Sequence, residues 1–375
     1  MVMVTVCEKD MCAGCMACID ICPKDAITIR DSLHAYNAVI DTDKCVECTA
    51  CHKVCQVGQK PDCHEPRLWI QGWADNEDIR KRSSSGGIAT ALMAAFIEEG
   101  GTVCSCTFAH GVFGFDFAES YDDLRRFVGS KYVKSNPSGI YKKIKTRLKN
   151  GEKILFIGLP CQVAAVKKYV GDKLAKCLYT VDLICHGSPS PKLLDMFLKE
   201  YNCSLDGITD IRFRKKTTFH LYDGCEGILP ERVQDNYTFA FLNCLDYTEN
   251  CYKCKYAQKE RVGDITLGDS WGSEMSSSEQ CKGISLVLCQ TDKGHKLLEN
   301  SKIHLGDVSI EKALASNHQL RHPSVAPEKR KDFFAYLESG LGFNKAVAKC
   351  YPKIYYKQKL KELLIKTKIL RGVDV

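Results

Sequence analysis

The stretch CAGCMACIDIC at residues 12–22 has a counterpart, CVECTACHKVC, at residues 45–55. Each block reads C-x2-C-x2-C-x3-C, the spacing with which a short loop wraps a 4Fe-4S cluster. In this arrangement three thiolates come from one block, and the fourth ligates the cluster of the other block. Buried free cysteines would have no reason to repeat the spacing, so we predict a two-cluster module that moves electrons. Its eight ligands would be Cys12, Cys15, Cys18, Cys22, Cys45, Cys48, Cys51 and Cys55.

The composition of the chain fits a metal-binding protein in a reducing compartment. Its 375 residues are enough for two or three domains, and 23 of them are cysteines. We recognise no signal peptide and no apolar run that approaches the ~20 residues of a membrane span. Thiols in such a protein serve metals or catalysis rather than disulfides, so we expect a cytoplasmic location. The net charge of +7 is mild and does not indicate a nucleic-acid partner.

Much of the excess positive charge lies at the C-terminal end, between Lys349 and Arg371. This segment mixes lysines with Tyr355, Leu360, Leu363, Leu364 and Ile369. A basic amphipathic helix of this kind can rest on anionic lipid or on an acidic partner. A docked C-terminal helix with solvated lysines gives the same pattern, and it is the interpretation we prefer.

Three parts of the chain can be separated from the sequence. Residues 1–60 are predicted to form the two-cluster module, in which segments 26–29 and 38–40 pair as a small hairpin. A polar linker at 60–66 leads into a larger body with regions 67–150 and 151–315, and residues 316–375 form a basic helical tail. In the body, we expect helices at 88–99, 141–149, 161–169 and 191–201 and strands at 103–108, 153–157, 178–184, 210–213 and 264–267. Strands that alternate with helices favour a parallel or mixed sheet, so the predicted fold class is multidomain α+β and α/β.

Cys161 and Cys185 each stand just beyond the C-terminal end of a predicted strand, where a helix soon follows. Open α/β sheets bind ligands at that rim, so the two sulfurs face one crevice if the strands are neighbours. A position near a helix N-terminus also favours the thiolate. Together with the C-x2-C pair Cys251 and Cys254 they make four ligands, enough for a third cluster. A four-cysteine zinc site would look the same in sequence, although the two clusters of the module favour iron.

Two loops and a basic segment are candidates for binding an anionic ligand. The serine- and glycine-rich segment 83–87 opens a helix, where backbone N–H groups suit a phosphate, but Ser85 fits a plain N-cap equally well. Segment 129–132 (GSKY) places a cation beside an aromatic ring, and it also fits an ordinary surface turn. The basic strand end at 212–216 suits an anionic substrate or a solvated edge.

Two further side chains have two interpretations each. Asp269, in the glycine-punctuated segment 263–272, could orient a cofactor or simply occupy a turn, and the turn is the commoner case. His186 could donate a proton or cap its loop, and we favour the cap. We identify no Ser-His-Asp set and no paired acids, so the sequence does not support hydrolysis.

The module resembles the bacterial ferredoxin with two 4Fe-4S clusters. Gln56 stands where the first block has Pro23, a position that shapes the turn and is not a ligand. Seven segments of the body, in order, resemble the family formed by the β subunits of coenzyme F420 hydrogenases and dehydrogenases. They are SSSGG (83–87), GSKYVKS (129–135), LFIGLPCQV (155–163), DLICHGSPS (182–190), RFRKK (212–216), CYKC (251–254) and RVGDITLGDSWG (261–272).

The family resemblance implies an FAD protein that passes electrons between 4Fe-4S clusters and a two-electron carrier. Carried over by motif, the FAD-binding residues would be Ser85, Gly86, Gly87, Ser130, Lys131 and Tyr132. The third cluster would be held by Cys161, Cys185, Cys251 and Cys254. Leu159 departs from the family pattern, which usually has threonine there, so a hydroxyl near the cluster or the flavin is missing.

The sequence therefore predicts an oxidoreductase in which electrons pass from the ferredoxin module through the third cluster to FAD, or in the reverse direction. The small carrier would be reduced coenzyme F420, a ferredoxin or a nicotinamide, with an unknown acceptor. A second hypothesis is an electron-transfer subunit whose substrate site lies on a partner redox subunit. A third, weaker hypothesis is a zinc-stabilised binding protein.

Overall fold

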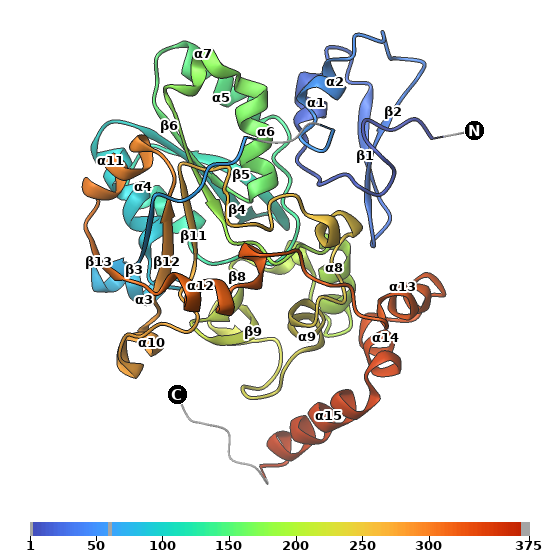
Figure 1. Ribbon diagram of the computed structural model, residues 1–375. Coiled ribbons are helices and arrows are strands. Elements are labelled where there is room, and N and C mark those ends of the chain that lie inside the picture. Colours follow the sequence, from blue (N-terminus) through green and yellow to red (C-terminus); the bar gives the residue numbers. More distant parts are fainter. Residues whose placement is uncertain (1–2, 59–61, 369–375) are drawn as a thin grey trace.

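The computed structural model describes residues 3–58 and 62–368, which form an N-terminal module, a body around a large sheet and a group of C-terminal helices (Figure 1). Lys60 and Pro61 of the predicted linker and Ile369 and Arg371 of the predicted tail lie outside the described residues. The structure confirms a mixed α/β architecture with a large mixed sheet. No helix in the described part of the chain has both the length and the apolar character to cross a membrane.

The N-terminal module repeats one backbone shape twice. Helices α1 (Ala17–Ile21) and α2 (Ala50–Val54) each follow a non-glycine residue in the left-handed region, Met16 and Thr49, both with a φ of 60°. Each helix ends on a cysteine with extended backbone. Non-glycine residues adopt the left-handed region rarely. Its presence at the same position of both blocks therefore shows that the two cysteine loops fold alike.

The module docks on the body through the first turn of α5 (Ile140–Lys149). The N-cap of this helix is Gly139, so the helix has no capping side chain of its own. Asp20 of α1 takes that role, because its carboxylate accepts hydrogen bonds from the backbone N–H of Gly139 (2.6 Å) and of Tyr141 (3.0 Å). A carboxylate at a helix N-terminus satisfies unpaired N–H groups and complements the helix dipole. The remainder of the module is the predicted antiparallel hairpin of β1 (Ile27–Asp31) and β2 (Tyr36–Ile40).

An eight-stranded mixed sheet forms the centre of the body, with strand order β13-β3-β12-β11-β7-β6-β4-β5. Four adjacent strands of this sheet run parallel and carry the predicted alternation with helices. These strands are β4 (Thr102–Ala109), β6 (Ile154–Gly158), β7 (Leu178–Leu183) and β11 (Ile265–Asp269). The outer strands pair antiparallel and are β3 (Leu68–Ala74), β5 (Val112–Ala118), β12 (Ser285–Cys289) and β13 (Ile303–Asp307).

Helices cover both faces of the large sheet. On one face α5 and α6 (Pro160–Val170) pack with the N-terminal module into a shared apolar core (Figure 1). On the other face α4 (Ile88–Glu98) and α11 (Asp292–Glu299) pack on Val103, Leu155 and other strand residues. Because both faces are covered, β6 (ILFIG) is buried along its whole length and reads as a continuous apolar run in the sequence.

The strand predicted at 210–213 belongs to a separate sheet and not to the large one. Strand β8 (Ile211–Lys215) pairs antiparallel with β9 (Thr218–Asp223), which in turn pairs with β10 (Glu226–Gly227). The apolar core below this small sheet is built from α8 (Pro191–Lys199), α9 (Asn236–Leu242), α13 (Arg330–Glu338) and α14 (Phe343–Cys350). The chain then continues into α15 (Pro352–Lys366), which extends away from the body (Figure 1).

The remaining helices are short connections. They are α3 (Glu77–Arg82), α7 (Asp172–Ala175), α10 (Ser277–Lys282) and α12 (Ile310–Ser316), with 3-10 turns at Asp122–Phe127, Leu205–Gly207, Glu249–Lys253 and His318–Leu320. The predicted body helices correspond to α4, α5, α6 and α8, with ends within two residues of the expected ones.

Candidate functional site

The cysteines of the module form two sets that differ in burial. Cys15 and Cys18 have both Cys12 and Cys55 among their charged neighbours, so three thiols of the first block meet one thiol of the second. This grouping corresponds to the crossed arrangement of the motif. All four of these thiols are buried, whereas Cys48 of the other set is exposed. The set of Cys22, Cys45, Cys48 and Cys51 therefore lies nearer the surface, and the role of all eight as ligands stays a prediction.

Two residues outside the motif favour thiolate at Cys12 and Cys55, whereas burial raises the pKa of Cys15 and Cys18. The thiol of Cys7 is hydrogen-bonded to Cys12 and Cys55, which lowers the pKa of Cys12 and brings the pKa of Cys55 to about 6. The Lys134 ammonium donates to the carbonyl oxygen of Ala13 (3.1 Å), and its charge also lowers the pKa of Cys12. Thiolate is the form of cysteine that binds metal.

Cys161 and Cys185 lie at the ends of neighbouring strands. Because β6 and β7 pair in parallel, the two sulfurs follow their strands at the same edge of the sheet. With Cys251 and Cys254 they line one cavity of about 60 Å³, whose wall also includes residues of the module. Cys161 is close enough to Cys15 of the buried set to contribute to the raised pKa of Cys15. The structure therefore brings the four predicted ligands of the third cluster together and places them beside the module.

Burial dominates the electrostatics of this third set. It raises the pKa of Cys161 and of Cys254, and it raises the pKa of Cys185 to about 12, so it outweighs the expected effect of the helix N-terminus. Metal binding would displace these protons. Across residues 3–58 and 62–368, no group of three or more His, Cys, Asp or Glu side chains closes around a single ion. A 4Fe-4S cluster instead distributes its four cysteine ligands over a larger core.

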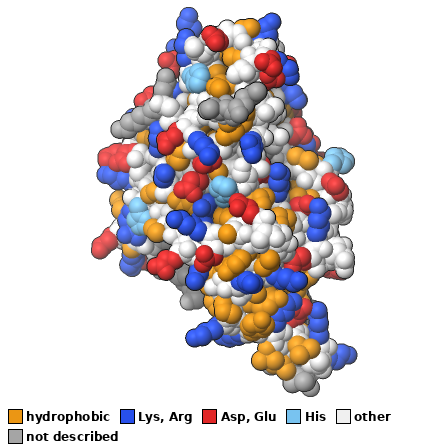
Figure 2. Space-filling view, turned by 90° about the vertical axis from the view of Figure 1, so that its right-hand side faces the viewer, with side chains coloured by type: hydrophobic (Ala, Val, Ile, Leu, Met, Phe, Trp, Pro, Cys, Tyr) orange, Lys and Arg blue, Asp and Glu red, His pale blue; other side chains and the backbone are white. Residues whose placement is uncertain are grey.

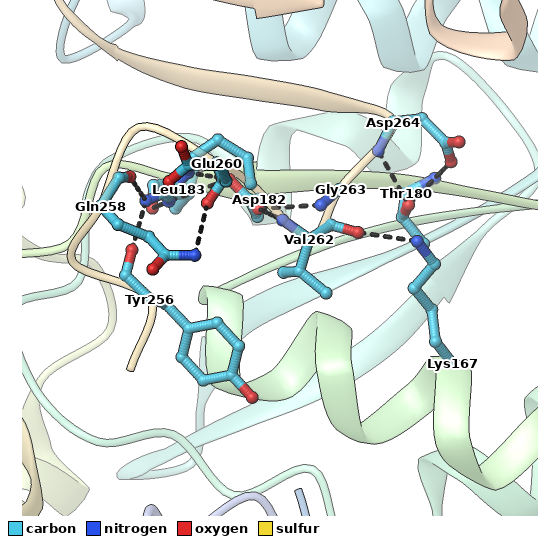
Figure 3. Close-up of polar contacts among 11 residues, drawn as sticks. Lys167, Thr180, Asp182, Leu183, Tyr256, Gln258, Glu260, Val262, Gly263 and Asp264 are labelled. Carbon is cyan, nitrogen blue, oxygen red and sulfur yellow. Dashed lines mark hydrogen bonds and ion pairs between the residues drawn. The ribbon is translucent and has the colours of Figure 1, made fainter. Parts of the chain in front are cut away.

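The loop that carries Cys251 and Cys254 is held by a buried ion pair (Figure 3). Asp182, at the end of β7, accepts hydrogen bonds from Arg261 Nε (3.3 Å) and Nη2 (3.1 Å) and from the backbone N–H of Gly263 (2.9 Å). Arg261 also donates to the carbonyl oxygen of Tyr256 (2.6 Å), just after the cysteine pair. Both ion-pair side chains are buried. The pair thus links the strand that leads to Cys185 with the loop that supplies the other two thiols.

An Arg261→Leu variant should therefore lose both stability and iron. Removing one partner of a buried pair leaves an uncompensated charge, which costs about 3–5 kcal/mol. Urea unfolding followed by circular dichroism measures the stability, and iron analysis measures the cluster content. The control is Arg67→Leu, which breaks the solvent-exposed pair with Asp292 and should cost at most about 1 kcal/mol. Equal losses in the two variants would contradict the proposed role of Arg261.

A second cavity of about 450 Å³ opens at the carboxyl ends of the parallel strands. Its wall includes the ends of β6, β7 and β11 and the first turn of α4. Of the predicted FAD-binding residues, Ser85, Gly87, Ser130, Lys131 and Tyr132 line the cavity. Gly86 is packed behind it, because a Cβ at that position would lie 2.4 Å from the carbonyl oxygen of Gly72.

The serine- and glycine-rich loop leaves the N-terminus of α4 free of any capping side chain. The N-cap is Gly87, with a φ of 88°, and the Ser85 hydroxyl donates instead to the carbonyl oxygen of Ile284 (2.9 Å). The N-cap interpretation of Ser85 is therefore wrong. Ser84 Oγ accepts the backbone N–H of Ser130 (3.0 Å) and so joins the two predicted loops. Uncapped N–H groups at a helix start suit an anionic ligand.

Lys131 is already engaged with the backbone. Its ammonium donates to the carbonyl oxygens of Phe127 (3.1 Å), Val128 (3.2 Å) and Gly129 (3.1 Å), and burial lowers its pKa. Tyr132 forms the aromatic part of the wall, with its ring stacked on that of Phe241 at 4.5 Å between centroids. The lysine therefore shapes the loop, and the aromatic ring faces the ligand space.

Residues of the basic segment 212–216 have different roles. Arg214 lines the large cavity and donates through Nη2 to Asp269 Oδ1 (2.8 Å), while its buried Nε and Nη1 have no hydrogen-bond partner among the described residues. Lys216 supports the serine- and glycine-rich loop by donating to the carbonyl oxygens of Ser83 (2.9 Å) and Ser85 (3.0 Å). Arg214 therefore offers two buried, unused donors to a ligand, and Asp269 orients it.

A short segment separates the two cavities. Leu159 and residues 185–188 line both of them, so the wall between the third cysteine set and the large cavity includes Cys185 itself. Gly187 fits there because a Cβ would lie 2.3 Å from the Tyr247 ring. The His186 ring does not cap its loop but contacts Gln319 (2.6 Å), and burial lowers its pKa to about 4, which keeps it neutral.

Several residues of the site were missed by sequence reasoning. Lys134, Asp182 and Arg261 all stand in segments that carry the family resemblance, yet no sequence signal shows that Asp182 and Arg261 pair across 79 residues. Gln319 lies beyond those segments. The sequence signal that could have pointed to these residues is their charge within the matched segments. The residues with which they pair can be known only from the strand order.

Comparison with known proteins gives matches over most of the chain. Residues 69–139 and 151–311 match the N-terminal and C-terminal models of the coenzyme F420 hydrogenase/dehydrogenase beta subunit, and residues 11–59 match a 4Fe-4S dicluster domain. A subunit of the F(420)H(2) dehydrogenase of Methanosarcina mazei is 24% identical over 307 residues, which cover 73% of this chain and 81% of the relative.

Two further matches come from Methanosarcina barkeri. The beta subunit of its coenzyme F420 hydrogenase is 27% identical over 217 residues, which cover 54% of this chain and 72% of the relative. A chain of the F420-reducing nickel–iron hydrogenase complex aligns in structure with a TM-score of 0.46 and 22% identity, over 70% of this chain and 93% of that chain.

Proposed function

Because the chain belongs to the family of coenzyme F420 hydrogenase and dehydrogenase beta subunits, we propose that it is an iron–sulfur flavoprotein oxidoreductase. Its three cysteine sets would hold three 4Fe-4S clusters, and its large cavity would hold FAD. The two-electron carrier would be reduced coenzyme F420 or another small redox carrier, and the one-electron side would face a partner redox subunit. As a protein with many reduced thiols, it would work in the cytoplasm.

The observation that carries this proposal is the shared wall of the two cavities. A cluster moves one electron at a time and a flavin exchanges one or two, so a flavin beside a cluster couples the two kinds of carrier. In this chain Cys185 contributes to both cavities. Its thiolate would hold the third cluster, while the residues after it line the flavin space.

The large cavity fits FAD in several independent respects. Its volume is within the range of cofactor sites. The free N–H groups at the start of α4 suit a pyrophosphate, and Tyr132 offers an aromatic surface. Arg214 lies on the side of the cavity nearer His186, and two of its N–H groups are buried without a hydrogen-bond partner among the described residues. Buried donors need an acceptor, and the ring carbonyl and nitrogen atoms of a flavin would supply one.

The three cysteine sets lie in a fixed order. The partly exposed set of Cys22, Cys45, Cys48 and Cys51 belongs to the outer part of the module. The buried set with Cys15 follows, and its neighbour Cys161 belongs to the third set. The third set ends at Cys185 on the wall of the large cavity. This order would let the module face a partner while the cavity receives a small carrier.

Anaerobic purification with analysis of iron, sulfide and flavin tests the proposal directly. We expect about 12 irons and one FAD per chain, because each cluster contains four irons. Zinc bound by Cys251 and Cys254, or a preparation that never binds flavin, would contradict it. The flavin should then be bleached anaerobically by one member of a panel of reduced F420, NADH, NADPH and reduced ferredoxin. If only one-electron donors bleach it, the chain is an electron-transfer subunit without its own substrate site.

A further inference from the structure

The last helix, α15, carries an apolar stripe that no described part of the protein covers. Tyr356, Leu360 and Leu363 are spaced as i, i+4 and i+7, so they lie on one face of the helix. Their exposed fractions are 66%, 58% and 57%. Figure 2 shows hydrophobic side chains bordered by lysine and arginine at the lower end of the molecule, where α14 and α15 lie.

The opposite face of α15 holds the helix to the body. Lys361 Nζ donates to the carbonyl oxygen of Arg232 (2.5 Å), and Gln358 Oε1 accepts the backbone N–H of Gln234 (3.2 Å). Glu362 is buried on this side. The attachment therefore fixes which way the helix faces, and it directs the apolar stripe outward.

Lysines border the stripe on both sides. On one side, Lys353 stands three residues before Tyr356, and Lys357 stands three residues before Leu360. On the other side, Lys359 stands four residues before Leu363, and Lys366 stands three residues after it. Residues three or four apart are neighbours on a helix surface, so all four lysines lie beside the stripe. The one carboxylate of the helix, Glu362, accepts from Lys359 (3.0 Å) and Lys366 (2.7 Å). No acidic side chain of α15 thus reaches the surface beside the stripe.

We propose that this face of α15 binds the surface of a membrane that contains anionic lipid. An apolar stripe with a tyrosine, bordered on one side by Lys353 and Lys357, which can extend toward headgroups, suits a helix that lies in a membrane interface. The positive border is complementary to anionic headgroups. A flat lipid surface also suits a helix at the lower edge of the molecule, because it requires no groove of matching shape (Figure 1). The interaction is peripheral, and the stripe enters only the headgroup region.

Co-sedimentation of the full-length protein with lipid vesicles tests this proposal. The protein should bind vesicles of equal parts phosphatidylglycerol and phosphatidylcholine, should not bind phosphatidylcholine alone, and should be released at ~1 M salt, where charges are screened within about 3 Å. Each lysine removed beside the surface should weaken binding about fivefold. The double variant Lys353→Gln/Lys357→Gln should therefore bind about 30-fold more weakly.

The matched control removes two exposed lysines from α5 instead, in the variant Lys142→Gln/Lys143→Gln. It has the same net charge and should bind as the unmodified protein does. The variant Leu360→Ser/Leu363→Ser, which keeps every lysine, should also bind less. Equal weakening in the control, or no binding to anionic vesicles, would overturn the proposal, as would an α15 found instead in contact with an acidic partner subunit. Iron and flavin content measured on the same samples shows separately whether the proposed redox function holds.

Discussion

A Cys185→Ser variant should lose about four irons per chain and keep about eight, because it removes one ligand of the third cluster and leaves the module intact. It should also stop electron transfer between the clusters of the module and the flavin. A two-electron donor would still bleach the flavin in its cavity, whereas a one-electron donor to the module would no longer reach it. The physical reason is that Cys185 lines both cavities. Electrons that pass from the third cluster to the flavin would therefore cross the wall at Cys185.

Iron analysis, the spectroscopic signal of the reduced clusters and stopped-flow flavin absorbance measure these effects. The matched control is Cys63→Ser, since Cys63 lies close to Arg261 but belongs to none of the three sets. The control should retain all of its iron and both modes of reduction. An unchanged iron content in Cys185→Ser would refute the third cluster, and loss of all iron would show that the module depends on it.

An Arg214→Met variant should lower the midpoint potential of the bound flavin by about 30–60 mV. Reduction makes the flavin ring more negative, and the buried guanidinium has two unused donors to stabilise that charge. A hydrogen bond to a charged group contributes about 1.5–3 kcal/mol. For a two-electron couple, about 1.4 kcal/mol corresponds to 30 mV, which gives the expected range.

Anaerobic redox titration of the flavin absorbance measures the potential, and the flavin content of each sample is measured beside it. Arg212→Met is the matched control, because Arg212 lies on the same strand but pairs with Asp210 and is not part of the cavity wall. Arg214→Lys should fall between the two, since it keeps the charge but not the planar pair of donors. An unchanged potential in a fully loaded Arg214→Met protein would remove Arg214 from the flavin site.

Much of the fold could be predicted because its signals are local. The helices α4, α5, α6 and α8 follow from apolar spacing and glycine or proline boundaries within a dozen residues. Strand β8 was identified without its partner β9, so the small sheet that these strands form was not predicted. The outer strands β3, β12 and β13 were not identified, and they pair across more than 200 residues.

For the charged residues too, the sequence predicted the type of segment but not the role of each side chain. The segment 212–216 was recognised as basic, but the sequence could not tell Arg214, which faces the cavity, from Lys216, which holds the loop of Ser83 and Ser85. Lys216 follows the last residue of β8 and has a φ of 52°, so the turn sets its direction, and the alternation of side chains along the strand does not. Likewise, Ser85 could not be separated from an N-cap until the contact with Ile284 was known.

By itself, the sequence determined the twelve cysteines proposed as ligands and the family, because ligand spacing in a short loop is a local property that motif repetition reveals. Only the tertiary structure decided the order of the three cysteine sets and the wall that Cys185 shares with the large cavity. Those features depend on which strands lie side by side. Burial of both sheet faces stabilises that strand order, and Asp20, which caps α5, places the module and its cysteines beside the sheet.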